Sequence, residues 1–229
     1  MVRGSNEDSY VADGGSEIFL VADGMGGHAA GEIASQIAAA AAEEVLSRQE
    51  SGLDMEELLQ LAVEKANERV YETQKVKSEY GGMGSTLTIL TFLENRYYVA
   101  QVGDSRAYLF RNNKLHQLTR DHSVVWSLYE NGILSKDEIS RHPQKNLITR
   151  SIGTHSEVEI DLFDDAALDG DIYLLCSDGL TDVLTDEDIR SIIKNGNGNP
   201  QNIGEILIRE ANSRGGPDNI TVVVVCMKP

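Results

Sequence analysis

Aspartates recur in this sequence where apolar, strand-like runs begin or end. Asp23 follows IFLVA, Asp104 follows YYVAQVG, and Asp178 follows DIYLLCS. Asp218 precedes ITVVVV, and Asp8 belongs to NED near the start of the chain. A single aspartate beside glycine is usually a turn or capping residue. Because strand ends on one edge of a β-sandwich can converge, this repeated placement instead favours one shared centre.

Converged carboxylates would repel one another and raise their own pKa values unless cations lay between them. Hard divalent ions such as Mg²⁺ and Mn²⁺ prefer carboxylate, carbonyl and water oxygens. A zinc-type ligand set is not visible, because the five histidines form no H-x-x-x-H pair and neither cysteine has a C-x-x-C partner. The residues by themselves therefore predict a binuclear metal hydrolase.

The stretch VADGMGGHAAGE, residues 21–32, suggests a second interpretation. Gly24, Gly26 and Ala29 fit the glycine fingerprint of a dinucleotide-binding turn, which would indicate a nucleotide-dependent oxidoreductase. Asp23, however, would repel a pyrophosphate. That interpretation also needs a parallel sheet, whereas the strand-like runs 86–93, 96–102 and 106–111 are joined by connections too short for parallel crossovers. They predict an antiparallel β-meander.

The remaining periodicities predict helices in pairs and strands in antiparallel groups. We expect helices over 29–48, 55–75, 186–194 and 200–213, and strands over 157–163, 171–176 and 220–227. Segment 122–150 is polar and partly helical, which is typical of an inserted flap. The chain is predicted to be one domain, 1–229, of class α+β: an α-β-β-α sandwich of two antiparallel sheets flanked by helix pairs.

The charge balance limits the partners that the protein can bind. Asp and Glu number 37 against 20 Lys and Arg, a formal net charge of −17. Such a chain is unsuited to nucleic acid or an anionic membrane surface. No apolar run approaches a membrane span and no signal pattern starts the chain, so a cytoplasmic location is expected. Cys176 and Cys226 indicate core packing and not a disulfide framework.

Eight sequence blocks together are similar to the metal-dependent protein phosphatases of type 2C, and most of all to the bacterial serine/threonine branch. The resemblance covers nearly the whole chain, with the blocks in the family's order. It implies hydrolysis of phosphoserine and phosphothreonine in proteins by a hydroxide that bridges two Mn²⁺ or Mg²⁺ ions, without a covalent intermediate. The blocks are VRGSNED, VADGMGGHAAGE, GGMGSTL, VGDSRAYL, LTRDHS, LITRSIG, CSDGLTD and GGPDNITVVVV.

The resemblance also assigns metal ligands. Asp23 would bridge two metals, with the Gly24 carbonyl on one of them, and Asp178 and Asp218 would hold the other. A third, weaker ion would use Asp104 and Asp178, with Asp182 as a further ligand. Asp8, together with Glu7, would act on the metals directly or through water.

Two further roles follow from the resemblance. Arg3 would clamp the substrate phosphate, for which its planar guanidinium is suited. Many members carry a histidine two places after the bridging aspartate as a general acid, whereas this chain has Met25 there. His28 either protonates the leaving oxygen or simply packs. The implied partners are phosphoproteins made by a serine/threonine kinase, and the alternative is an impaired pseudophosphatase that acts as a binding module.

Overall fold

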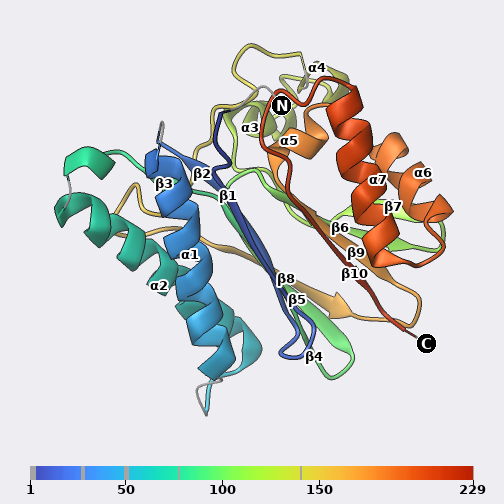
Figure 1. Ribbon diagram of the computed structural model, residues 1–229, viewed down its shortest axis with the longest axis horizontal. Coiled ribbons are helices and arrows are strands. Elements are labelled where there is room, and N and C mark those ends of the chain that lie inside the picture. Colours follow the sequence, from blue (N-terminus) through green and yellow to red (C-terminus); the bar gives the residue numbers. More distant parts are fainter. Residues whose placement is uncertain (1–3, 27–28, 49–51, 77, 140, 229) are drawn as a thin grey trace.

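In the computed structural model the chain forms four layers, helices against a sheet, a second sheet, and helices again (Figure 1). The structure describes residues 4–26, 29–48, 52–76, 78–139 and 141–228. The α-β-β-α sandwich expected from the sequence is therefore confirmed. No helix in these ranges is long and apolar enough to cross a membrane.

The first sheet has the strand order β1-β2-β4-β5-β8, with the short β3 paired to β2. All of its pairings are antiparallel. Strand β8 begins later than the expected 157–163, and β1 was not among the expected strands. The bounds are β1 Asp8–Asp13, β2 Ile18–Met25, β3 Gly84–Ser85, β4 Leu87–Leu93, β5 Arg96–Val102 and β8 Asp161–Ala166.

The second sheet has the order β10-β9-β6-β7 and is also antiparallel. Alternate side chains of β9 point to opposite faces, as a strand requires. Tyr173 and Leu175 pack between the sheets, while Leu174 and Cys176 pack toward the outer helices. The bounds are β6 Arg106–Arg111, β7 Lys114–Gln117, β9 Ile172–Cys176 and β10 Val222–Cys226.

The three-strand meander expected over 86–111 is wrong at its second connection. β4 and β5 do form a hairpin, closed where Leu93 pairs with Arg96. β6, however, belongs to the other sheet, so residues 103–105 carry the chain from one layer to the next. Gly103 makes this corner possible, because its φ is +103° and a Cβ there would lie 2.6 Å from the Thr86 side chain. Asp104 is thereby placed at the junction of the two sheets.

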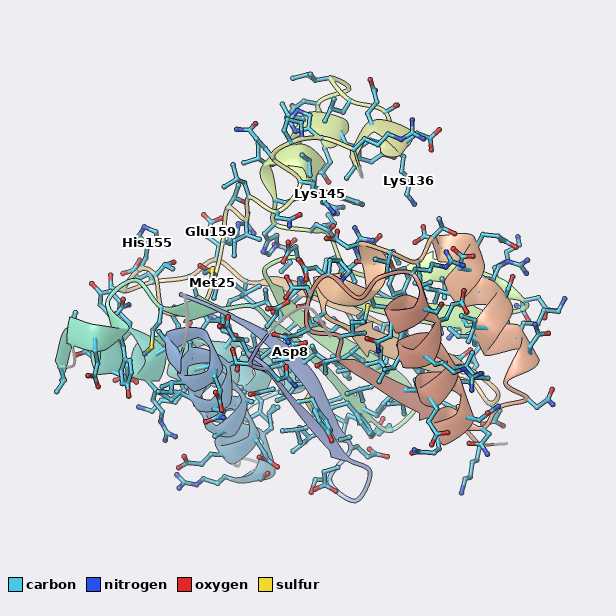
Figure 2. All side chains as sticks on the ribbon, turned by 45° about the horizontal axis from the view of Figure 1, so that its top comes forward. Asp8, Met25, Lys136, Lys145, His155 and Glu159 are labelled. Atoms are coloured by element: carbon cyan, nitrogen blue, oxygen red, sulfur yellow. The ribbon has the colours of Figure 1, made fainter. Side chains whose placement is uncertain are left out.

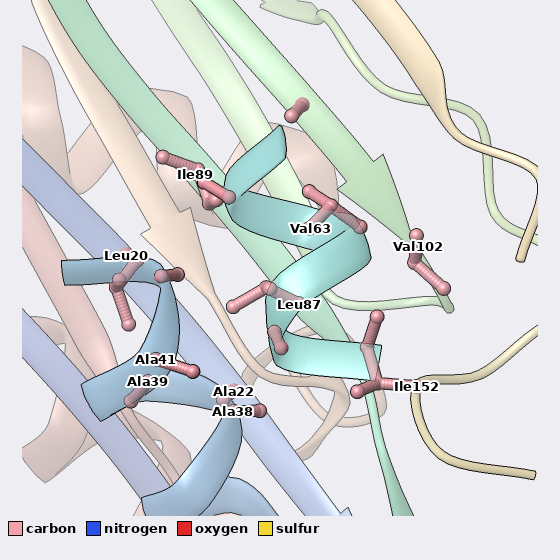
Figure 3. Packing of buried hydrophobic residues seen from close by; sticks show 14 of the residues in the cluster. Leu20, Ala22, Ala38, Ala39, Ala41, Val63, Leu87, Ile89, Val102 and Ile152 are labelled. Atoms are coloured by element: carbon pink, nitrogen blue, oxygen red, sulfur yellow. The ribbon is translucent and has the colours of Figure 1, made fainter. Parts of the chain in front are cut away.

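Helices α1, Ala29–Arg48, and α2, Met55–Val76, cover the first sheet. Figure 3 shows the small side chains of α1, among them Ala38 and Ala41, against Leu20 of β2 and Val63 of α2. Alanines at these buried positions let the helix lie close to both neighbours. A capping box precedes α2, since the Glu57 amide donates to Asp54 Oδ1 and the Asp54 amide donates to Glu57 Oε2.

Helices α6, Asp186–Asn195, and α7, Pro200–Ser213, cover the second sheet. Asn199 caps α7 by accepting a hydrogen bond from the Asn202 amide, as the sequence predicts. Two shorter helices lie in different parts of the chain: the 3-10 helix η1, Ser78–Tyr80, follows α2, and α5, Asp178–Thr181, follows β9.

The flap segment, residues 122–150, is partly helical as expected. It contains α3, Val124–Glu130, and α4, Lys136–Ile139. In Figure 2 this segment lies over one end of the sandwich, and its Lys136 and Lys145 point toward the main body. It is the same end at which β2 and β9 finish and the corner after β5 turns (Figure 1).

Candidate metal centre

The first two carboxylates of the site face each other across neighbouring strands. Asp8 of β1 is the register partner of Asp23 of β2. Like charges directly opposite one another destabilise a sheet. The pair is held in place by its surroundings, because the Asp23 amide donates to Thr86 Oγ1 at 2.9 Å and Asp8 Oδ2 accepts from Ser177 Oγ at 2.8 Å.

The second sheet supplies two more carboxylates through a close approach of two loops. Asp178 opens α5 directly after β9, and Asp218 lies just before β10. A Cβ at Gly179 would lie only 1.9 Å from the backbone oxygen of Asn219. Glycine is required at position 179, because any side chain would push these loops apart.

Most of the predicted ligands line one pocket. This metal pocket has a volume of about 300 Å³. Residues from the flap segment, Asn146 and Ile148, line its outer side. Five of the predicted ligands line it: Asp23, Gly24, Asp104, Asp178 and Asp218.

Burial and mutual repulsion disfavour the charged forms of these carboxylates. Burial, followed by the charges of Asp178 and Asp8, holds the pKa of Asp23 well above its usual range. Burial and the charge of Asp178 also hold the pKa of Asp104 well above its usual range. Burial, with the charges of Asp182 and Asp218, raises the pKa of Asp178 to about 6. The pocket therefore crowds several carboxylates together without enough positive charge nearby to stabilise their ionised forms.

These residues fit hard divalent cations. Burial also raises the pKa of Asp8, and its Oδ1 is buried without a hydrogen-bond partner among the described residues. In that part of the chain no three His, Cys, Asp or Glu side chains are drawn together tightly enough to form a complete metal cage. Mg²⁺ characteristically takes one or two carboxylates and keeps several waters, so an open pocket with spread carboxylates suits such an ion.

Asp182, Met25, Arg3 and His28 remain to be placed relative to the metal pocket. Asp182 lies beside the metal pocket, where its carboxylate contacts Lys145 Nζ at 2.7 Å. Met25 lines the metal pocket at the position that many family members give to histidine. Arg3 and His28 lie outside the described residues.

Sequence reasoning missed the groups that hold the carboxylates in place. Asn219 Oδ1 accepts from the Glu7 amide at 3.0 Å, and its Nδ2 donates to the Ser5 carbonyl, which fastens the start of β1 to the loop before β10. Thr86 Oγ1 lies 2.7 Å from Ser105 Oγ and joins Asp23 to the corner that carries Asp104. Hydroxyl and amide residues carry no spacing pattern of their own. Only their position next to the aspartates could have indicated them.

Comparison with known proteins agrees with this geometry. Residues 4–196 match the family model described as protein phosphatase 2C. The serine/threonine protein phosphatase PstP of Mycobacterium tuberculosis is 42% identical over 98% of the chain, and the serine/threonine phosphatase stp of Listeria welshimeri is 36% identical over 98%. A solved structure of the catalytic domain of PstP, in complex with two manganese ions, superposes with a TM-score of 0.88 at 38% identity. That likeness covers 100% of this chain and 94% of that one.

The chain belongs to the protein phosphatase 2C family. It spans 42% of the length of mycobacterial PstP and 91% of the length of the listerial phosphatase.

Proposed function

We propose that this protein is a metal-dependent serine/threonine protein phosphatase. The observation that carries the proposal is the single pocket in which β2, the corner after β5, α5 and the loop before β10 place four carboxylates. The relatives named as serine/threonine phosphatases support the reaction, and the two manganese ions of the PstP catalytic domain support the cofactor. Residues 1–229 would form one catalytic domain.

The proposed ligand assignment is the one that the resemblance of the sequence to type 2C phosphatases implies. Asp23 and Gly24 would hold a first ion, and Asp178 and Asp218, with the bridging Asp23, a second. Asp104, Asp178 and Asp182 would hold a weaker third, and the ions would be Mn²⁺ or Mg²⁺. When bound, these ions supply an activated water and neutralise phosphoryl oxygens, which reconciles the acidic pocket with an anionic substrate.

The chain's own residues would shield the pocket, bind the phosphate and donate a proton. Asn146 and Ile148 of the flap segment cover the pocket and would limit the access of water to the bound phosphate. Arg3 would bind the phosphate, and His28 would donate a proton to the leaving oxygen. The substrates would be cytoplasmic phosphoproteins made by a serine/threonine kinase, and not nucleic acid or membrane components. A pseudophosphatase is disfavoured, because every aspartate assigned to a metal lies in or beside this pocket.

Phosphate release from a phosphothreonine peptide tests the proposal. The wild type should release phosphate with Mn²⁺ and with Mg²⁺ but not with chelator, and Asp178→Asn should lower the rate by at least about a hundredfold, the scale of losing a charge-stabilising group. Asp169→Asn, which changes an exposed aspartate outside the metal pocket, is the matched control and should keep the wild-type rate. Release that persists in chelator, or that Asp178→Asn leaves intact, would refute the proposal.

A further inference from the structure

A polar pair interrupts the apolar surface between the two sheets. Gln101 of β5 and Thr88 of β4 are register partners, and both side chains are fully buried. Two residues further along the same face, the partners Val99 and Leu90 pack between the sheets. An apolar pair at positions 101 and 88 would avoid the cost of burying polar groups. The polar pair is therefore explained by what it binds.

The amide of Gln101 binds the backbone on both sides of Asp104. Its Nε2 donates to the Gly103 carbonyl at 2.9 Å and to the Ser105 carbonyl at 2.7 Å. Carbonyl oxygens can only accept, so the NH₂ group must face them. The amide Oε1 then accepts from Thr88 Oγ1 at 2.7 Å. Both donors of this buried amide are thus used on the corner that carries Asp104.

This corner has to be held against repulsion between carboxylates. Asp104 and Asp178 line the same pocket, and the charge of Asp178 acts against the charged form of Asp104. In the metal-free protein this repulsion favours movement of the corner away from α5, and Gly103 gives its backbone little resistance of its own. Gln101 does not line the metal pocket, so it acts only through the backbone of the corner.

We propose that Gln101 is a positioning residue that holds the Asp104 carboxylate close enough to Asp178 for the two to share a divalent ion. Its amide fixes the carbonyls before and after Asp104, and so sets the direction of that side chain. Thr88 keeps the amide in the orientation that this needs. Fully satisfied buried networks of this kind make the local structure rigid. The inference rests on the proposed metal-dependent function.

Two substitutions remove the hydrogen bonds while nearly keeping the shapes of the side chains. Gln101→Met is close in size but has no donor for the two carbonyls, and Thr88→Val keeps the branched shape but cannot donate to Gln101. If both residues act through one amide, their effects on metal affinity are not independent. The double variant should then lose less affinity than the product of the two single losses.

Asn67 of α2 provides the matched control. It is also a buried amide that binds the backbone of a loop. Its Oδ1 accepts from the Gly153 amide at 2.7 Å, and its Nδ2 donates to the carbonyls of His155 and Ser156. Neither Asn67 nor these loop residues line the metal pocket. Asn67→Leu should therefore lower the midpoint of urea unfolding, as Gln101→Met does, without changing metal affinity.

Calorimetric titration with Mn²⁺, together with urea unfolding of each metal-free variant, tests the inference. Asp104→Asn identifies the binding step that depends on Asp104, because it should abolish that step. We expect Gln101→Met to weaken the same step by at least about tenfold, the lower end of the usual effect of losing a ligand's supporting hydrogen bonds. Thr88→Val should weaken it by a smaller factor, and the other steps should keep their wild-type affinities.

An unchanged affinity of this step in Gln101→Met would overturn the inference. An equal loss in Asn67→Leu would also overturn it, because that would indicate a general loosening of the fold. If Gln101→Met does not fold, wild-type affinity in Thr88→Val is the contrary result.

The wild type separates this failure from that of the proposed function. If it binds Mn²⁺ exactly as Asp104→Asn does, Asp104 holds no ion and only the positioning role of Gln101 is wrong. If the wild type binds no Mn²⁺ at all, both proposals fall.

Discussion

Individual aspartates of the metal pocket are buried close to one another, and their charged forms are destabilised as a result. Asp23, Asp104, Asp178 and Asp218 were predictable from their places at strand ends, and they do share a pocket. The carboxylate pair Asp8 and Asp23, which face each other in register, could not be predicted because register depends on the pairing of β1 with β2. At this scale the sequence predicts which carboxylates gather in one pocket but not which groups hold them in place.

The crowding of Asp178 predicts a pH-dependent penalty in the metal-free protein. Its pKa in the folded chain is raised to about 6, so between about pH 4 and 6 the folded state binds more protons than the unfolded state. Stability is therefore lost as the pH rises through this window. Asp178→Asn should raise the free energy of unfolding at pH 7.5 by on the order of 1–2 kcal/mol, and by nothing below pH 4.

Urea unfolding of the metal-free protein at both pH values measures this difference. Asp169→Asn, at an exposed position, should leave the free energy of unfolding unchanged, and excess Mn²⁺ should reverse the sign by stabilising the wild type more than Asp178→Asn. An equal effect of Asp178→Asn at pH 4 and pH 7.5 would contradict the assigned crowding.

At the scale of elements, connections decide where the reactive groups meet. The helices 29–48, 186–194 and 200–213 were predictable within a residue or two from periodicity and caps. The corner at residues 103–105 was not, because a three-residue connection can close a hairpin or switch sheets. Which of the two occurs depends on the contact between Gly103 and Thr86, and these residues lie on separate elements.

The close approach of two loops at Gly179 leads to a prediction about the connections that assemble the site. Gly179→Ala would force its methyl group onto the Asn219 carbonyl, so we expect a loss of about 1–3 kcal/mol of stability and weaker Mn²⁺ binding as Asp178 and Asp218 separate. Gly204→Ala, within α7, is the control, since the nearest atom to an added Cβ is Val222 Cγ2 at 3.7 Å. It should stabilise by about 0.5–1 kcal/mol.

Chemical denaturation together with Mn²⁺ titration measures both effects. If Gly179→Ala were as stable as Gly204→Ala and bound Mn²⁺ equally well, the close approach would not be what assembles the site.

At the scale of the whole molecule, the four carboxylates of the metal pocket lie at the end where the two sheets meet. The architecture could be predicted because the apolar runs and helix pairs leave few ways to bury both faces of two sheets. The order β1-β2-β4-β5-β8 could not be predicted, because it depends on pairings between residues far apart in the chain. Asp23 lies on the first sheet, while Asp178 and Asp218 flank strands of the second. A metal centre here would link the two layers.

The number of Mn²⁺ ions bound by the wild type and by Asp23→Asn tests this arrangement most directly. If one carboxylate on the first sheet serves two ions, then losing it should weaken both of the tightest binding steps by at least about tenfold each, with Asp169→Asn unchanged. Retention of two tight ions by Asp23→Asn, with affinities equal to those of the wild type, would contradict a shared centre between the sheets.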